Sequence, residues 1–168
     1  SRYAESLAKG ERVYIATAQA WDDEMKVRIA KHQAQRGTGW ETLEVPLDLA
    51  ATLRDEDKAR RFILVDCLTL WISNLMHHER DVAREIEQLA TTLASMKAHV
   101  VLVSNEVGQG IVPENAMARA FRDWQGLCNQ CIAMAVDEVV MVVAGIPVPI
   151  KKARRPQGKA QTSKSASR

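Results

Sequence analysis

The run Phe62-Ile63-Leu64-Val65-Asp66 places four apolar residues directly before an acid. A short apolar run that is rich in β-branched residues predicts a buried strand. Nucleotide-hydrolysing folds hold a magnesium ion with a carboxylate at the end of a central strand, where it is rigid and points at the phosphates. Many strands of α/β proteins end in aspartate, so the pattern favours this role for Asp66 without establishing it.

Similar runs on both sides of this segment predict a sheet. We expect further buried strands at Arg12–Thr17, Val100–Ser104 and Glu138–Ala144, with a weaker one at Glu41–Val45. We expect helices at Tyr3–Ala8, Asp22–Gln35, Leu47–Arg54, Leu68–His77, Val82–Met96 and Ala116–Ala135. Apolar strands that alternate with helices predict an α/β fold with a mostly parallel sheet, flanked by helices on both faces.

The ends of these strands are the positions at which to look for a site. Ligands of open parallel sheets bind beyond the carboxyl ends of the strands. Those ends are Thr17-Ala18-Gln19, Asp66-Cys67 and Ser104-Asn105-Glu106. Two of these three segments contain an acid, Asp66 in one and Glu106 in the other.

The charge of the chain is unevenly distributed. Residues 151–168 carry seven basic side chains and no acid, which leaves 16 basic against 21 acidic residues in 1–150. We therefore expect one domain over 1–151 and a basic, disordered tail over 152–168. The tail is expected to be solvated, and we expect no nucleic acid partner; contact of the tail with nucleic acid is the alternative.

Cysteine usage and hydropathy point to the cytoplasm. Three cysteines suit a reducing compartment, and no apolar run of about 20 residues could cross a bilayer. Cys128-Asn-Gln-Cys131 has the spacing of half a zinc site, but no second pair completes it. The two thiols belong to an apolar stripe with helical spacing, so we interpret them as packing residues. That stripe is Met117, Phe121, Trp124, Cys128, Cys131 and Ala135.

The usual cradle for nucleotide phosphates, G-x-x-x-x-G-K-[ST], does not occur in the chain. Ser1 stands directly before a predicted helix, where the last residue of that motif would fall. We therefore expect that the sequence begins inside a phosphate loop and is without the first strand of the fold.

His32 has a setting that could support covalent catalysis. Arg28, His32 and Arg36 follow one another at four-residue steps on the predicted helix Asp22–Gln35 and so share one flank. Two guanidinium groups can neutralise phosphate oxygens while the imidazole attacks phosphorus. Met25 and Ile29 lie on the same stripe, so spacing alone favours a core or boundary histidine.

The segment Ser104–Asn115 joins a predicted strand to a long predicted helix. Gly108 and Gly110 would allow close approach of a ligand, or serve only to make a turn. On the helix that follows, a polar stripe lies opposite the apolar one and fits either a solvated face or a contact with substrate or subunit. Its members are Arg119, Arg122, Gly126 and Asn129.

Taken together, several blocks closely resemble the adenosylcobinamide kinase / adenosylcobinamide-phosphate guanylyltransferase family, in order from Ser1 to about Lys151. The blocks are Tyr14-Ile-Ala-Thr-Ala, Asp22-Asp-Glu-Met, Arg28-Ile-Ala-Lys-His32, Arg36, Trp40-Glu-Thr-Leu-Glu44, Leu64-Val-Asp66-Cys-Leu-Thr-Leu-Trp-Ile-Ser-Asn74-Leu, Val103-Ser-Asn-Glu106-Val-Gly-Gln-Gly-Ile-Val-Pro-Glu-Asn115 and Ala120-Phe-Arg-Asp-Trp-Gln-Gly126. The resemblance implies a RecA-like P-loop NTPase fold.

The resemblance also implies a function in cobalamin biosynthesis. ATP or GTP would phosphorylate the aminopropanol hydroxyl of adenosylcobinamide, and GMP would then pass from GTP to that phosphate. The second step would run through a GMP-histidine intermediate at His32, which reverses the interpretation from spacing. The family further implies Mg²⁺ as cofactor, GTP and ATP as substrates, and a homo-oligomer, a trimer.

Site residues follow from the matching positions. Nucleotide contacts are implied for Ser1, Ala16, Thr17, Ala18, Gln33, Ala34, Gln35, Arg36, Glu44 and Asp66. Asp66, with Ser1, would hold Mg²⁺, and Glu44 would suit hydrogen bonds to a guanine edge.

Two departures from the family's pattern matter. Without the loop and its lysine, the chain as written should bind triphosphates and phosphorylate poorly, and the tail matches nothing in the family. One rival is another P-loop kinase or nucleotidyltransferase, which has no need of the His32 block. A second is a truncated or degenerate protein that binds nucleotide or corrinoid without full catalysis.

Overall fold

The structure, a computed structural model, describes residues 2–19 and 38–152. The chain divides into two compact units, Ser1–Val136 and Asp137–Arg168. Among the described residues, the first unit carries a four-stranded sheet and the second a two-stranded one. That residues 1–151 act as one domain stays a prediction.

The first unit alternates strands with helices, as predicted. Its elements are α1 (Arg2–Ser6), β1 (Glu11–Ala16), β2 (Trp40–Glu44), α3 (Leu49–Asp55), β3 (Arg61–Asp66), α4 (Leu68–His77), α5 (Val82–Leu93), β4 (His99–Val103) and α6 (Ala116–Ala135). The bounds of α4 and α6 are those predicted. The predicted helix Asp22–Gln35 lies outside the described residues.

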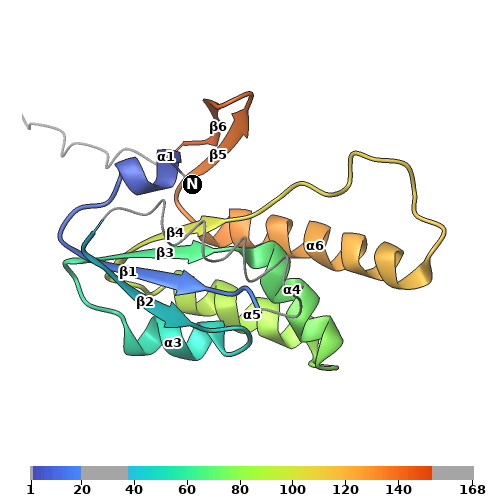
Figure 1. The fold of residues 1–168 in the computed structure, drawn as a ribbon, viewed down its shortest axis with the longest axis horizontal. Coiled ribbons are helices and arrows are strands. Elements are labelled where there is room, and N and C mark those ends of the chain that lie inside the picture. The colour runs from blue at the N-terminus through green and yellow to red at the C-terminus, as the bar shows by residue number, and fades with distance from the viewer. Residues whose placement is uncertain (1, 20–37, 153–168) are drawn as a thin grey trace, which may run out of the picture. The chain divides into compact units, whose positions relative to one another are not determined.

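The sheet of this unit is parallel throughout, with strand order β2-β1-β3-β4 (Figure 1). All four strands therefore end at one edge of the sheet. The α/β class and the parallel sheet are confirmed, and the arrangement is consistent with the P-loop NTPase architecture that the resemblance implies.

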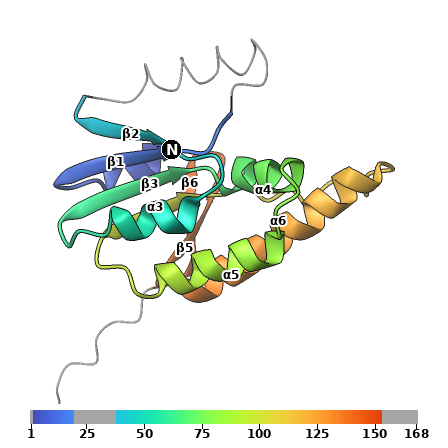
Figure 2. The same cartoon turned by 90° about the horizontal axis from the view of Figure 1, so that it is seen from below.

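One face of the sheet carries the main core. Val13, Ile15, Ile63 and Val65 pack there against apolar side chains of α3, α4, α5 and α6, and Trp71 of α4 is fully buried. Figure 2 shows α3 and α5 on this side of the sheet. Because side chains alternate along a strand, Tyr14 (between Val13 and Ile15) and Leu64 (between Ile63 and Val65) point to the other face.

A smaller, aromatic cluster lies on that second face. It is built on Tyr14, Phe62 and Leu64, with Trp40 and Val103 packed against them. The Trp40 ring meets Tyr14 and Phe62 edge-on, with centroids 6.4 and 6.0 Å apart. This cluster lies on the same face of the sheet as the side chains of the last residues of β1, β2 and β3.

The second unit corrects one prediction. The segment expected as a buried strand at Glu138–Ala144 is β5 (Val139–Val143), which pairs antiparallel with β6 (Ile146–Lys151). Ala144 and Gly145, both with positive φ, form the two-residue turn that such hairpins favour. The sequence concealed β6 because Pro147 and Pro149 interrupt its strand pattern, and both strands are largely exposed.

A second correction concerns the start of α6. Met117, expected in the core stripe, is 74% exposed, whereas Cys128 is fully buried. The apolar stripe meets the core only from Phe121 onward, because the first turn of α6 extends past the helices that it packs against. Within the described ranges, no helix has both the length and the apolar character that crossing a membrane requires.

Candidate active site

Three predicted site residues form one row across the carboxyl edge of the sheet. Ala16 pairs with Glu44 of β2 on one side and with Asp66 of β3 on the other. By strand alternation, all three side chains lie on the face of the aromatic cluster. Two strand spacings separate Glu44 from Asp66, roughly 10 Å. We call Glu44, Ala16 and Asp66 the terminal row.

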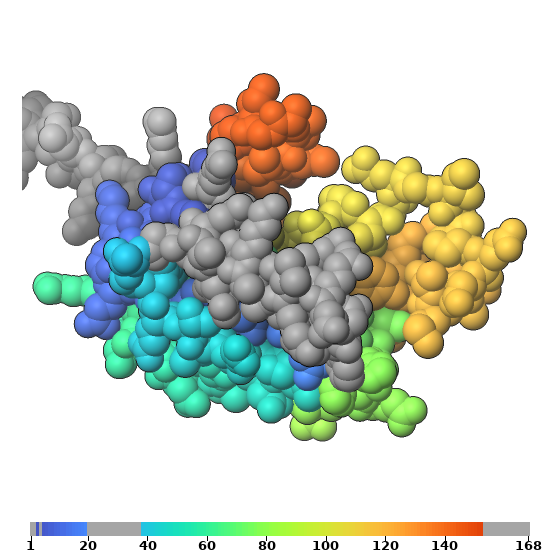
Figure 3. Space-filling model, viewed as in Figure 1, coloured from blue at the N-terminus to red at the C-terminus, as the bar shows by residue number. Residues whose placement is uncertain are grey.

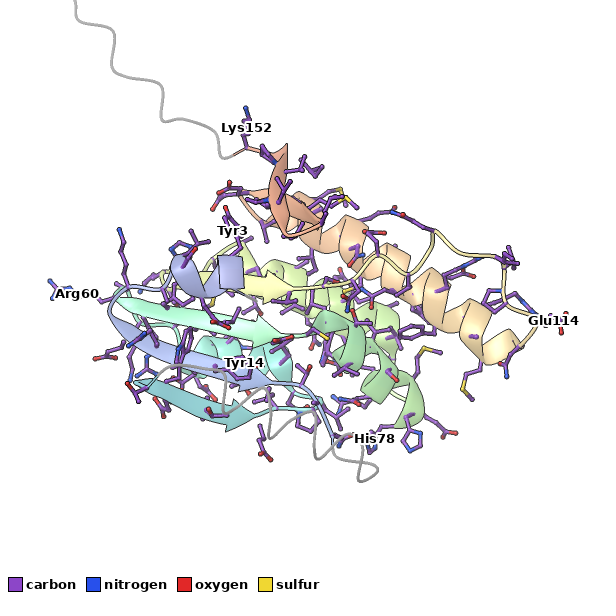
Figure 4. The ribbon with its side chains drawn as sticks, turned by 45° about the horizontal axis from the view of Figure 1, so that its top comes forward. Tyr3, Tyr14, Arg60, His78, Glu114 and Lys152 are labelled. Atoms are coloured by element: carbon purple, nitrogen blue, oxygen red, sulfur yellow. The ribbon has the colours of Figure 1, made fainter. Side chains whose placement is uncertain are left out.

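Asp66 is held in place by a neighbour on β1. The Tyr14 hydroxyl donates to Asp66 Oδ2 at 3.1 Å, and Tyr14 itself is buried. Figure 4 shows Tyr14 on its interior strand. Asp66 is partly exposed. A fixed and accessible carboxylate at this edge is suited to hold a cation beside a phosphate.

Thr17 fixes the turn directly beyond the terminal row. Its hydroxyl donates to the carbonyl oxygen of Cys67 at 2.7 Å and accepts from Cys67 N at 2.8 Å. Asn74 of α4 donates to the Thr17 carbonyl at 2.7 Å, and Thr17 N donates to the carbonyl of Asp66 at 3.2 Å. Every polar group of this buried residue binds protein, so Thr17 shapes the edge through these bonds.

Cys67 follows Asp66 but is not suited to act as a nucleophile. Burial raises the pKa of its thiol above the ordinary value, and the negative charge of Asp66 raises it further. Backbone N–H groups of Leu70 and Thr69 oppose this shift only in part. The thiol therefore stays protonated at neutral pH, and a protonated thiol is a weak nucleophile.

The other cysteines pack as predicted. Cys128 is fully buried in the main core, and Cys131 packs against the same cluster. Burial first, and then Cys131, raises the pKa of Cys128 to about 12. In the part of the chain that the structure describes, no three acidic, histidine or cysteine side chains gather into a cluster that could hold a metal ion by itself.

The polar stripe of α6 contacts the segment that precedes the helix. Arg119 donates to the carbonyls of Pro113 and Glu114, at 2.9 and 2.5 Å. A shallow hollow lies farther along the helix, lined by Gly108, Arg122, Asp123, Gly126, Leu127 and Gln130. Part of the polar stripe therefore binds the loop that precedes α6, and the stripe is not wholly solvated.

The remaining predicted site residues lie outside the described residues. They are Ser1, Arg28, His32, Gln33, Ala34, Gln35 and Arg36. Their placement, and hence the histidine intermediate, stays a prediction. Ala18, by contrast, is described and partly buried just beyond the terminal row.

Sequence reasoning missed two residues that build the site. Tyr14 is predicted within a strand and within a block that resembles the family, but without a role, although its hydroxyl orients Asp66. Asn74 donates to the carbonyls of both Thr17 and Pro46, at 2.7 and 3.1 Å. The available signal for Asn74 was a lone amide in an otherwise apolar helix run, since such a group must find a partner when buried.

Comparisons with known proteins show the family of the chain. The sequence model of the family described as cobinamide kinase / cobinamide phosphate guanyltransferase matches residues 1–150. The chain is 47% identical, over 90% of each sequence, to the bifunctional adenosylcobalamin biosynthesis protein CobP of Pseudomonas aeruginosa. It is 40% and 38% identical to the proteins named CobU of Salmonella typhimurium and Escherichia coli, over 90% of this chain and 93% of theirs.

Proposed function

Because the chain belongs to the cobinamide kinase / cobinamide phosphate guanyltransferase family, we propose that it catalyses both reactions of that description in cobalamin biosynthesis, with phosphorylation the slower in the sequence as given, which contains no phosphate-loop motif. The observation that carries the proposal is the terminal row, which places the carboxylates of Glu44 and Asp66 on one face at the edge where sheet ligands bind. Residues at this edge suit a nucleoside triphosphate whose base lies toward β2 and whose phosphates lie toward β3.

The first reaction transfers a phosphoryl group to adenosylcobinamide. The substrate hydroxyl attacks the γ-phosphorus of ATP or GTP, and the nucleoside diphosphate leaves. Phosphoryl transfer depends mainly on positioning and on neutralising charge. Asp66, oriented by the Tyr14 hydroxyl, would hold the cation that neutralises the charge of the phosphates. Ala16, Thr17 and Ala18, together with Ser1, would border the nucleotide.

The second reaction transfers GMP in two displacements. The imidazole of His32 attacks the α-phosphorus of GTP, a nitrogen–phosphorus bond forms, and pyrophosphate leaves. The phosphate of the acceptor then attacks the same phosphorus and releases the imidazole, which gives adenosylcobinamide-GDP. Gln33, Ala34, Gln35 and Arg36 would contact the nucleotide beside His32, and Glu44 would accept hydrogen bonds from the guanine edge.

The donor set at the edge fits a magnesium ion. Mg²⁺ is usually held by one or two carboxylates together with substrate phosphates and waters, so a single well-placed carboxylate suffices. Asp66, with the Ser1 hydroxyl, would hold it. When bound, the ion neutralises charge on the phosphates.

We extend the proposal to the assembly and its location. The trimer and the cytoplasmic location implied at the level of sequence stay predictions. A sedimentation measurement on the purified protein checks the first: three chains per particle are expected, and a monomer at all concentrations contradicts it.

Covalent labelling tests the proposal. The protein is incubated with GTP labelled at the α-phosphate, denatured and analysed for bound label. We expect acid-labile, base-stable label on the wild type and none on His32→Ala or His32→Asn. His78→Ala is the matched control, because His78 lies exposed after α4, away from the terminal row (Figure 4). Label that survives both His32 substitutions rules out the proposed intermediate.

A further inference from the structure

The segment that leaves β4 is tied to two helices. Asn105 donates from its backbone N and from Nδ2 to Thr69 Oγ1 of α4, at 3.1 and 2.9 Å. Asn129 of α6 donates from Nδ2 to the Asn105 carbonyl at 3.2 Å and to Glu106 Oε1 at 2.9 Å. Glu106 is exposed, yet Asn129 binds both its carboxylate and the carbonyl of the preceding residue, Asn105.

A buried amide determines which way Asn129 points. Gln125 is fully buried, and its Nε2 donates to Ser104 Oγ and to Asn129 Oδ1, both at 2.9 Å. Ser104 Oγ also donates to Asn129 Oδ1, at 2.6 Å. Because Oδ1 accepts these two bonds, Nδ2 of the same amide is left to face Glu106.

This arrangement lies at the edge that carries the terminal row. Asp66 pairs with Val103, the last residue of β4, so Glu106 lies in the loop three residues past the end of this neighbouring strand. Figure 3 shows the segment 104–115 at the surface beside α6. The carboxylate of Glu106 lies in a loop at the edge proposed for the reaction, and a buried hydrogen-bond network orients it. Such a carboxylate is better suited to act on a substrate than to solvate a surface.

The two proposed reactions differ in one requirement. A hydroxyl acceptor must lose a proton when it attacks phosphorus, whereas the phosphate acceptor of the GMP transfer is already an anion. We propose that Glu106 is the general base of the phosphorylation step, and that Asn129 and Gln125 are the residues that position it. This inference rests on the proposed function.

The step balances without a further reactant. The acceptor oxygen forms a bond to the γ-phosphorus, and the bond from that phosphorus to its bridging oxygen breaks. The nucleoside diphosphate leaves with the bonding electron pair. The hydroxyl proton passes to the carboxylate of Glu106, which later releases it to water.

Glu106→Gln tests the role of the carboxylate. The glutamine keeps an oxygen for Asn129 but cannot take a proton. We expect the kcat for phosphorylation of adenosylcobinamide to fall about 100-fold, with KM within about a factor of two. GMP transfer from GTP to adenosylcobinamide phosphate, supplied directly to the same sample, should keep its rate and so proves that the variant is folded.

Two further variants separate catalysis from loop structure. Glu106→Asp keeps a base and should regain part of the lost rate, whereas Asn129→Asp replaces the donor to Glu106 and to the Asn105 carbonyl with a carboxylate oxygen and should lower kcat about 10-fold. Glu114→Gln is the matched control, since Glu114 is a glutamate of the same segment at its far end (Figure 4), and both of its rates should equal those of the wild type.

Each outcome decides the inference. Phosphorylation by Glu106→Gln at the wild-type rate overturns it, as does a rise in KM with kcat unchanged or an equal loss in both reactions. If the wild-type protein transfers GMP but phosphorylates no hydroxyl, the kinase half of the proposed function fails, and this inference fails with it.

Discussion

Thr17 shows how a buried side chain can hold the backbone of a site in place. Its hydroxyl bridges the backbone N–H and carbonyl of Cys67 on the neighbouring strand end, and Asn74 binds its carbonyl. These bonds join the turn after β1 to the turn after β3. Asp66 lies directly before that second turn, so the placement of its carboxylate depends on them.

Substitution of Thr17 should therefore affect stability in a way that depends on the hydroxyl. Thr17→Val keeps the shape but leaves the N–H of Cys67 without a partner, while the Cys67 carbonyl keeps its bond from Trp71 N, and we expect a loss of about 2 kcal/mol in the free energy of unfolding. Thr17→Ser keeps the hydroxyl and removes one methyl group, which should cost about 1 kcal/mol. Urea unfolding of both variants measures this; a serine variant as unstable as the valine variant contradicts it.

At the scale of single residues, the sequence predicted where residues lie along the strands better than it predicted their hydrogen-bond partners. Asp66 could be placed at a strand end because it follows a recognisable apolar run, whereas Ala16 and Glu44 were implied by the resemblance to the family. The bond between Tyr14 and Asp66 spans 52 residues of sequence, and that between Asn74 and Thr17 spans 57. Such contacts depend on strand order and register, which no local pattern encodes.

At the scale of elements, α6 joins the core to the candidate site. Cys128 and Ile132 are buried in the main core, while Gln125 and Asn129 on adjoining positions hold the segment after β4. The helix thus combines an apolar contact, which stabilises the fold, with a polar network, which orients Glu106. The sequence predicted the bounds of α6 and its apolar stripe from Phe121 onward, but not the role of Gln125.

The burial of Cys128 makes stability depend on pH. Because its pKa is raised from 9.0 to about 12, the folded state holds the thiol proton more tightly than the unfolded state does. This contribution is fully present below about pH 9 and is lost as the pH rises toward 12, by at most about 1.4 kcal/mol per pH unit.

Two variants of α6 check this pH dependence by urea unfolding between neutral and alkaline pH. Cys128→Ala should make the decline above pH 9 shallower than in the wild type. Ile132→Val, on the same buried face, should lower stability by about 1 kcal/mol at every pH, because it removes a methyl group and no proton. A Cys128→Ala profile parallel to that of the wild type contradicts the assignment.

The hairpin marks the limit of element prediction. The run Val139–Val143 predicts a buried strand because it is continuous and apolar, yet among the described residues it pairs with β6 alone and is largely exposed. Periodicity reports that a strand forms and not which partner it has. Pro147 and Pro149 masked that partner, since proline is disfavoured within strands.

At the scale of the whole molecule, both proposed reactions take place at one edge of one sheet. The parallel order β2-β1-β3-β4 brings three strand ends with candidate catalytic or binding carboxylates together, and the family match over residues 1–150 covers all of them. The fold class could be predicted from the alternation of strands and helices. The row itself needed the register of the strands, which only the structure supplies.

The central claim is that GMP passes through His32 on its way to the acceptor. The most direct test is a chase: protein labelled with GMP is freed of GTP and mixed with adenosylcobinamide phosphate. We predict that label leaves the protein and appears in adenosylcobinamide-GDP at a rate no slower than steady-state turnover, whereas the acceptor without its phosphate releases none into product. Label that stays on the protein, or leaves far more slowly than turnover, contradicts the account.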